Sequence, residues 1–242
     1  MLGLKTSLNA LAACVLVPSL AIANCTDDAM LVFDASGSMA EMGYNGLDHP
    51  RITEARIAMR KALPDITPVR RVGLVVYGPG DSEVCSHVDL RLSPQPDAAD
   101  QILAEIDALV PDGNTALTEA VQYAADVLDA RNKPATIVLV TDGKETCGGA
   151  TCQLAAHLTS KAPELVIHVI GFRVRGDHFN FEGFDSNPEF EEVPAAVRCL
   201  SDQTGGLYVG AESIDELVDA MHKTLGCPLF SEGLRHRFVS PG

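Results

Sequence analysis

Apolar and polar residues follow one another along the chain in two different patterns. Short, nearly continuous apolar runs recur between longer stretches in which apolar residues are three or four positions apart. The short runs have the length of buried strands, and the longer stretches have the period of helices that cover a sheet with one face. This alternation predicts a doubly wound, Rossmann-like α/β fold, with a mostly parallel sheet and helices on both of its faces.

Six segments are predicted to be strands. Five of them are near-continuous apolar runs, whereas residues 88–92 alternate between apolar and polar and follow the preceding strand after a loop that contains Gly and Pro. A period of two is typical of a strand with one exposed face, so we expect one antiparallel edge strand in a six-stranded sheet. In chain order, the predicted strands are residues 30–33, 72–77, 88–92, 136–140, 165–170 and 207–209.

Helical spacing of apolar residues is clear in four stretches, and the region around Cys152 is also expected to be helical. A single long irregular stretch, rich in Asp, Glu, Phe and Gly, runs from Arg175 to about Pro194. A loop of that length at the end of a strand is often functional. The four predicted helices cover residues 52–62, 102–109, 117–128 and 214–225.

The N-terminal residues differ in composition from the rest of the chain. Lys5 precedes an apolar run, and residues 21–23 (Ala-Ile-Ala) form a small-x-small cleavage pattern. We interpret residues 1–23 as a secretory signal peptide, residues 24–227 as one domain and residues 228–242 as a C-terminal tail. A membrane anchor is the alternative for the first segment, but the apolar run is short for a span and contains a proline. No transmembrane segment is expected in the mature chain, which is predicted to be secreted and either periplasmic or extracellular.

The chain is strongly acidic, and this excludes some partners. It has 18 Lys and Arg residues against 33 Asp and Glu residues, for a formal net charge of −15. Nucleic acid and anionic lipid are poor partners for such a surface. Solubility alone accounts for most of these charges.

The mature chain is expected to contain six cysteines. An even number outside the cytosol indicates three disulfides, whose connectivity the sequence leaves open. Spacing supports a local pair of Cys147 with Cys152, which we predict to be a structural staple that stiffens one wall of the site described next. A zinc site is the rival interpretation and lacks pairs of ligands. The other four cysteines, of unassigned pairing, are Cys25, Cys85, Cys199 and Cys227.

Oxygen-bearing side chains follow three predicted elements at positions where a doubly wound sheet binds its ligand. Asp34, Ser36 and Ser38 follow the first predicted strand, Asp142 follows the fourth predicted strand, and Thr115 precedes a helix. Taken singly, each is ordinary as a helix cap or turn residue. Together they offer two carboxylates and three hydroxyls, which are hard ligands. They predict a divalent cation site, with Mg²⁺ favoured and Mn²⁺ or Ca²⁺ as alternatives.

The pattern Asp-x-Ser-x-Ser, a distant Thr and Thr-Asp-Gly after a strand resembles the von Willebrand factor A (VWA) domain with a complete metal-ion-dependent adhesion site. Thr204-Gly-Gly206 and the helix start at residues 213–217 extend the resemblance to about residues 28–226. The segment Glu145-Thr-Cys-Gly-Gly149 is similar to a secreted bacterial branch of the family. That similarity alone favours a Gram-negative periplasm.

The resemblance implies a role for each ligand and for the ion. Ser36 and Ser38 are expected to bind the ion directly, whereas Asp34, Thr115 and Asp142 bind it directly or through water. Two carboxylates only neutralise a dication, so the ion stays electrophilic toward another anion. The resemblance therefore implies a non-enzymatic module whose ion captures a Glu or Asp carboxylate of a protein partner.

Two other functions remain open at this stage. An accessible Mg²⁺ or Mn²⁺ ion can also support hydrolysis of phosphoesters or esters, for which His49, His87 and His178 would be offered as bases. His168 falls in a buried strand and is expected to be hydrogen-bonded in the core. Alternatively, the metal is purely structural. The rim that would select a partner is expected in the loops at residues 41–51, 79–87 and 175–194.

Overall fold

A computed structural model of the chain describes residues 27–42, 49–80, 85, 87–143, 145–174 and 193–226. The predicted signal peptide and tail, together with Cys25 and Cys227, lie outside the described residues. So do residues 175–192, which make up almost all of the predicted long loop, and His178 within it.

The six strands form one sheet in the order β3-β2-β1-β4-β5-β6. All neighbouring pairs are parallel except β2 with β3, which is antiparallel. The predicted fold class and edge strand are therefore confirmed. The strands are β1 (Ala29–Asp34), β2 (Val72–Tyr77), β3 (Val88–Gln95), β4 (Ala135–Thr141), β5 (Leu165–Phe172) and β6 (Tyr208–Ala211).

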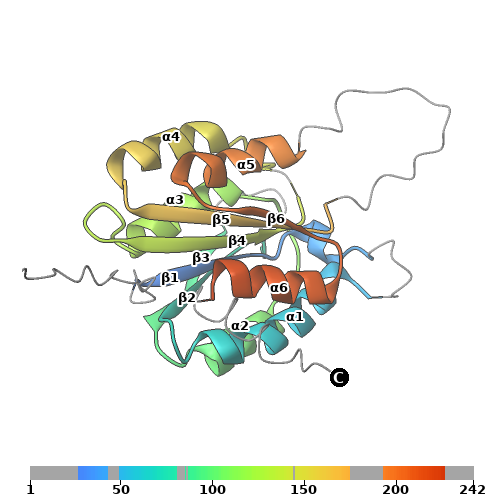
Figure 1. Cartoon of the computed structure of the whole chain (residues 1–242). Coiled ribbons are helices and arrows are strands. Elements are labelled where there is room, and N and C mark those ends of the chain that lie inside the picture. The colour runs from blue at the N-terminus through green and yellow to red at the C-terminus, as the bar shows by residue number, and fades with distance from the viewer. Residues whose placement is uncertain are drawn as a thin grey trace, which may run out of the picture.

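Helices cover both faces of this sheet (Figure 1). α1, α2 and α6 pack on one face, and α3, α4 and α5 pack on the other. A short 3-10 helix, η1 (Gly37–Ala40), follows β1. The helices are α1 (Arg51–Ile66), α2 (Ala99–Ala108), α3 (Leu117–Val127), α4 (Thr151–Lys161), α5 (Val193–Thr204) and α6 (Ile214–Thr224).

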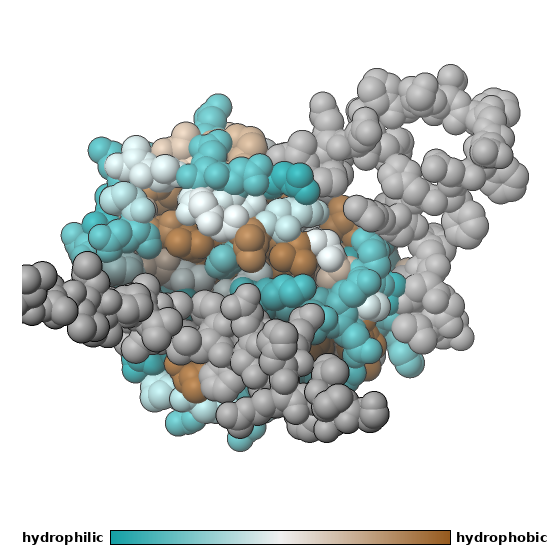
Figure 2. All heavy atoms as spheres, viewed as in Figure 1, coloured by the Kyte–Doolittle hydropathy of each residue, from teal (hydrophilic) through white to brown (hydrophobic). Residues whose placement is uncertain are grey.

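The core consists of two apolar clusters, one on each side of the sheet. In β1, Leu31 and Phe33 point to the cluster under α1, α2 and α6, while Met30 and Val32 point to the other. Both faces of the central strands are buried, which explains why these strands lack polar alternation. On the face of the molecule drawn in Figure 2, hydrophilic residues cover the outward sides of the helices, and hydrophobic residues gather in a band between the helical layers.

Several elements differ from the sequence prediction in their bounds; β3, for example, continues to Gln95 and α1 to Ile66. Residues 193–204 form α5, where no helix was predicted, and β6 begins one residue later than expected and continues to Ala211. Among the side chains of α5 that the structure describes, the apolar ones that pack into the core are Val197, Cys199 and Leu200. Such a short apolar stripe gives a weak periodic signal.

The strand order places the reversal of the sheet between β1 and β4. Chain connections leave these two strands in opposite directions, and ligands bind in the crevice that opens at their carboxyl ends. Asp34 is the last residue of β1, and Asp142 directly follows β4.

Candidate metal centre

The loop after β1 curls around the carboxylate of Asp34. Asp34 Oδ1 accepts hydrogen bonds from the backbone N–H of Ser36 at 2.9 Å and from its hydroxyl at 2.6 Å. Asp34 Oδ2 accepts a hydrogen bond from the hydroxyl of Thr141, at the end of β4, at 2.7 Å. Asp34 is fully buried, so both of its oxygens are fixed in direction by the ends of two central strands.

A chain of polar contacts continues from Asp34 to the second carboxylate. The hydroxyls of Ser36 and Ser38 lie 3.2 Å apart, and Ser38 Oγ donates to Asp142 Oδ1 at 2.7 Å. The structure thus brings together four of the five predicted ligands, although 104 residues separate Ser38 from Asp142.

Thr115 lies at the same edge of the sheet, because the loop that carries it is hydrogen-bonded to the loop after β1. The carbonyl of Gly113 accepts the N–H of Gly37 at 3.1 Å, between the two ligand serines, and Thr115 is 5% exposed. Gly113 and Gly78 both have positive φ, and a Cβ on Gly113 would collide with the carbonyl oxygen of Gly78. A Cβ on Gly78 would in turn collide with the backbone of Ser36. The loops beneath the site therefore meet backbone to backbone, without side chains between them.

Arg51 is a site residue that the sequence analysis treated only as a loop boundary. It begins α1, and its side chain is 6% exposed. Arg51 Nη1 donates to the carbonyl of Ser38 at 3.1 Å and to Glu41 Oε2 at 3.0 Å, and it lies 3.3 Å from Asp142 Oδ2. One guanidinium thus fixes two predicted ligands. No local pattern gives this role, because it depends on α1 folding back against η1.

The electrostatics of the two carboxylates favour a cation. Burial, and then the charge of Asp34, raise the pKa of Asp142 to about 7, although Ser38 and Arg51 act in the opposite direction. Asp142 Oδ2 is buried and accepts no hydrogen bond, and its charged neighbour is Arg51. A dication between Asp34 and Asp142 would relieve their repulsion and give this oxygen a ligand bond. The donor set of carboxylates and hydroxyls therefore fits a hard divalent metal.

The described residues contain no group of three or more His, Cys, Asp or Glu side chains placed to hold a metal. A cation at this site would therefore depend on the serine and threonine hydroxyls in addition to the two carboxylates. This composition favours Mg²⁺, Mn²⁺ or Ca²⁺, which take oxygen ligands readily.

The predicted disulfide between Cys147 and Cys152 is wrong. Cys147 is bonded to Cys85, in the loop between β2 and β3, and Cys152 is bonded to Cys199, so that α4 is joined to α5. Spacing suggested a local pair, but Cys152 lies in the first turn of α4 and meets the neighbouring α5 instead.

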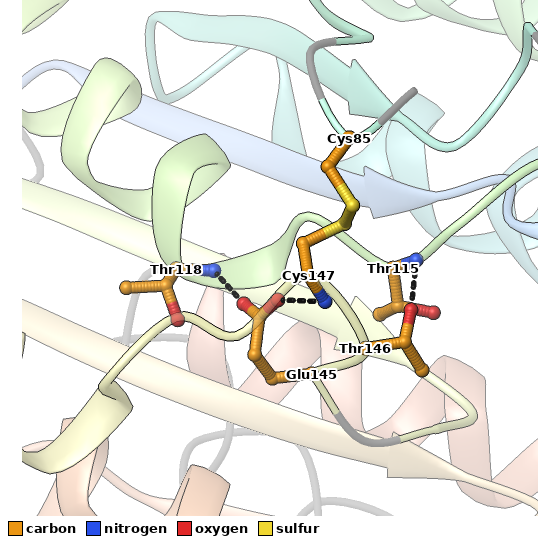
Figure 3. The surroundings of a disulfide bond; sticks show 6 residues. All are labelled: Cys85, Thr115, Thr118, Glu145, Thr146 and Cys147. Atoms are coloured by element: carbon orange, nitrogen blue, oxygen red, sulfur yellow. Dashed lines mark hydrogen bonds between the residues drawn. A yellow bond between two sulfur atoms is a disulfide. The ribbon is translucent and has the colours of Figure 1, made fainter. Parts of the chain in front are cut away.

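The segment at residues 145–147, which forms one wall of the site, is hydrogen-bonded to α3 and to Thr115 (Figure 3). Glu145 accepts backbone hydrogen bonds from Thr118 and from Cys147, each at 2.7 Å. Thr146 exchanges two hydrogen bonds with Thr115, at 2.8 and 3.1 Å. Cys147 thus does form a disulfide beside the site, as predicted, but its partner is Cys85 in the loop between β2 and β3.

The three histidines within the described residues 49–168 that the sequence singled out, His49, His87 and His168, differ in their exposure and contacts. His49 is exposed, and the imidazole of His87 lies where a side chain on Gly80 would be. His168 is partly buried in β5, and its Nδ1 accepts the backbone N–H of Leu207 at 3.0 Å. The prediction that His168 is hydrogen-bonded in the fold is confirmed.

None of the helices in the described part of the chain combines the length and apolarity that a membrane crossing requires.

Comparison with known proteins supports the interpretation of the fold. Residues 29–145 match the family model described as von Willebrand factor type A domain. A relative from Bacillus subtilis (strain 168), named uncharacterized protein YwmD, is 26% identical over 207 residues, which cover 80% of this chain and 82% of the relative.

Solved structures with the same fold include the von Willebrand factor type A protein from Catenulispora acidiphila. Its TM-score is 0.57 at 17% identity, over 83% of this chain and 42% of that one. Another is proximal thread matrix protein 1 from the mussel byssus with a zinc-occupied MIDAS motif. Its TM-score is 0.53 at 18% identity, over 85% of this chain and 46% of that one. This chain therefore spans less than half the length of either solved structure.

The family match covers the segment from β1 to Glu145, which includes all five predicted ligands, and the same fold continues through β5 and β6. Residues 29–145 are therefore similar to the von Willebrand factor type A domain, and the described part of the chain has the fold of such domains.

Proposed function

We propose that this protein is a secreted VWA module that binds a divalent cation, Mg²⁺ in the first instance, and uses the ion to capture an acidic side chain of a protein partner. The ligands are Asp34, Ser36, Ser38, Thr115 and Asp142. The observation that carries the proposal is the continuous contact chain from Asp34 to Asp142, which ends at a buried carboxylate oxygen without a hydrogen bond.

Local charge supports the capture of an anion. Two carboxylates balance the dication, and the buried guanidinium of Arg51 adds a positive charge beside Asp142, while its other partner, Glu41, has a 68% exposed side chain. An ion in such a site stays electrophilic and can accept a further oxygen ligand. Because binding is reciprocal, a partner that binds the ion also raises the affinity for the ion.

The mussel protein has zinc in its MIDAS motif, the metal-ion-dependent adhesion site, so a structural neighbour with this fold binds a divalent metal. For the present chain we propose a binding function and no catalytic residue.

Disulfides persist in oxidising compartments, which supports secretion after removal of residues 1–23 and a periplasmic or extracellular location for the domain at residues 24–227. We further propose that residues 228–242 are a tail.

The test uses mature protein, residues 24–242, immobilised and exposed to envelope extract from its own source in Mg²⁺ or in EDTA. Ser36→Ala removes one ligand, and Ser93→Ala, at an exposed position on β3, is the matched control. We expect a protein that is retained in Mg²⁺ by wild type and by Ser93→Ala, and lost in EDTA and with Ser36→Ala. Neutralising one Asp or Glu of that protein should abolish its retention.

Retention that ignores both the ion and Ser36 would contradict the proposal. If Mg²⁺ raises the melting temperature and no carboxylate-dependent partner is retained, the metal has a structural role. Generic phosphoester and ester substrates would then test the hydrolase alternative.

A further inference from the structure

Three consecutive residues after the metal-site loop each hold a different part of the site wall. They are Glu145, Thr146 and Cys147. Glu145 and Thr146 point toward the start of α3 and the loop before it, whereas the side chain of Cys147 points to Cys85 (Figure 3). Asp142, a proposed ligand, precedes them closely in sequence. Their contacts therefore link one side of the candidate metal centre to the other.

Glu145 supplies a cap that α3 lacks in its own sequence. The N-cap position of α3 is Ala116, which has no side-chain acceptor. Glu145 Oε2 accepts the N–H of Thr118 in the first turn of the helix at 2.7 Å, and Oε1 accepts the N–H of Cys147 at 2.7 Å. A carboxylate at this position satisfies a free helix donor and interacts favourably with the helix dipole.

Thr146 fixes the backbone of the predicted ligand Thr115 from both sides. Its hydroxyl accepts the N–H of Thr115 at 2.8 Å, and its own N–H donates to the carbonyl of Thr115 at 3.1 Å. With both of its backbone groups engaged, Thr115 has little freedom to move relative to the loop that carries Asp142.

Cys147 anchors this arrangement to a third loop. Its disulfide to Cys85 closes a separation of 62 residues and reaches the connection between β2 and β3. The other described disulfide, Cys152–Cys199, closes 47 residues and joins α4 to α5. The two bonds constrain loops of similar length, but only the first adjoins residues that contact Thr115.

We infer that Glu145, Thr146 and the Cys85–Cys147 disulfide form a clamp that positions Thr115, and that this clamp sets the affinity of the site for its divalent cation. The inference rests on the proposed function in one respect, namely that the site binds a cation. It adds positioning residues that touch no ion themselves.

The coordination preferences of the ion explain why a clamp is needed. A small divalent ion demands near-ideal geometry, and Thr115 lies on a third loop, separate from the loop after β1 and from the loop after β4 that carry the other proposed ligands. Loss of contacts that orient a ligand typically weakens metal binding by roughly 10 to 100-fold. A loosened Thr115 should therefore lower metal affinity while the other ligands remain in place.

The first test measures the dissociation constant for Mn²⁺ by electron paramagnetic resonance of the free ion, using mature protein. Cys85→Ser/Cys147→Ser is compared with Cys152→Ser/Cys199→Ser as the matched control. We expect Mn²⁺ binding to weaken by roughly tenfold in the first double variant and to stay within about twofold of wild type in the second. Both variants should melt at lower temperature, so a general loss of stability cannot produce this difference.

The second test keeps both disulfides. Thr146→Val removes the acceptor for Thr115 while preserving shape, and Thr146→Ser restores the hydroxyl. Binding of Mn²⁺ should weaken by roughly tenfold with valine and return to the wild-type value with serine. This pair decides the question if Cys85→Ser/Cys147→Ser fails to fold.

The outcomes separate the clamp from the function on which it rests. If wild type fails to bind Mn²⁺, both the clamp and the proposed metal site are overturned. If wild type binds Mn²⁺ and Thr146→Val binds it as tightly as Thr146→Ser, the clamp is wrong and the proposed partner capture stands.

Discussion

Asp34 and Asp142 hold two buried charges of the same sign within one hydrogen-bonded chain. Burial and the charge of Asp34 raise the pKa of Asp142, which means that the folded domain disfavours its ionised form in the absence of metal. Repulsion between two such carboxylates lowers the stability of the metal-free fold, and a bound cation would offset that loss. The metal-free domain should therefore gain stability when one of these charges is removed.

We expect Asp142→Asn to raise the free energy of unfolding in EDTA by about 1–2 kcal/mol at a pH above 7. The amide oxygen can still accept the hydroxyl of Ser38, while the repulsion by Asp34 disappears. Added Mg²⁺ should stabilise wild type and leave the variant unchanged. Urea unfolding with and without Mg²⁺ measures both effects, with the exposed Asp65→Asn as control. A loss of stability in EDTA would contradict this account.

At the scale of single residues, the sequence was enough to predict that Asp34, Ser36, Ser38 and Asp142 lie close together, since all four lie at or just after the end of β1 or β4, where the sheet reverses. Arg51 escaped notice because its contacts with Ser38 and Asp142 arise only when the start of α1 packs against η1. Such tertiary contacts leave no periodic or spacing signal in the chain.

One histidine adds a hydrogen bond at the start of the β5–β6 pairing. The Nδ1 of His168 accepts the N–H of Leu207, at the entrance to β6, and the next bond along, from Val169 to the carbonyl of Leu207, is 2.8 Å long. Burial, with a smaller contribution from Arg70, lowers the pKa of His168 to about 4. Protonation would remove the acceptor and place a charge in a partly buried position.

Stability should therefore fall as the pH drops through the range from about 6.5 to about 4. In that window the unfolded chain binds a proton at His168 and the folded chain does not, so the contribution of up to about 3 kcal/mol is complete above pH 6.5 and lost below pH 4. His168→Asn can keep the acceptor without the titration, so its stability should depend less on pH. Urea unfolding near pH 7 and near pH 4.5 gives the comparison, with the exposed His157→Asn as control. Equal slopes for wild type and His168→Asn would refute the assignment.

Strands were easier to predict from sequence than helices. A run such as β2 is buried over its whole length, and its residues are all apolar, glycine or tyrosine, so its bounds agree with the prediction. In contrast, the part of α5 whose side chains are described, residues 197–204, offers the core few apolar side chains, and the helix is attached to α4 by Cys152–Cys199. A disulfide holds α5 in place in part, and a pattern of hydrophobic residues cannot reveal a helix that is held in this way.

Across the whole molecule, the two described disulfides bridge elements that are distant in sequence. Their connectivity depends on which loops and helices meet in space, and this is why spacing misled the pairing of Cys147. By loop entropy, closure of 47 residues by Cys152–Cys199 should contribute about 4 kcal/mol.

We expect Cys152→Ser/Cys199→Ser to fold and to lose about 4 kcal/mol of unfolding free energy. The increase in melting temperature on addition of Mg²⁺ should be the same as in wild type, because this bond lies in the α4–α5 layer. Urea unfolding and thermal melts test the two parts separately. A loss below about 1 kcal/mol would mean that the denatured chain already keeps α4 and α5 together.

The backbone contacts beneath the site have a consequence for how such a protein can diversify. Gly78 and Gly113 leave no room for side chains between the loops that carry Ser36 and Thr115. Under the proposed function, we therefore expect variation that alters partner preference to accumulate farther out, at exposed positions such as Met42, where exchanges leave these backbone contacts intact. Under the proposed function, a lineage built on this floor could acquire new partners by changing its outer loops while keeping one unaltered arrangement of the proposed ligands.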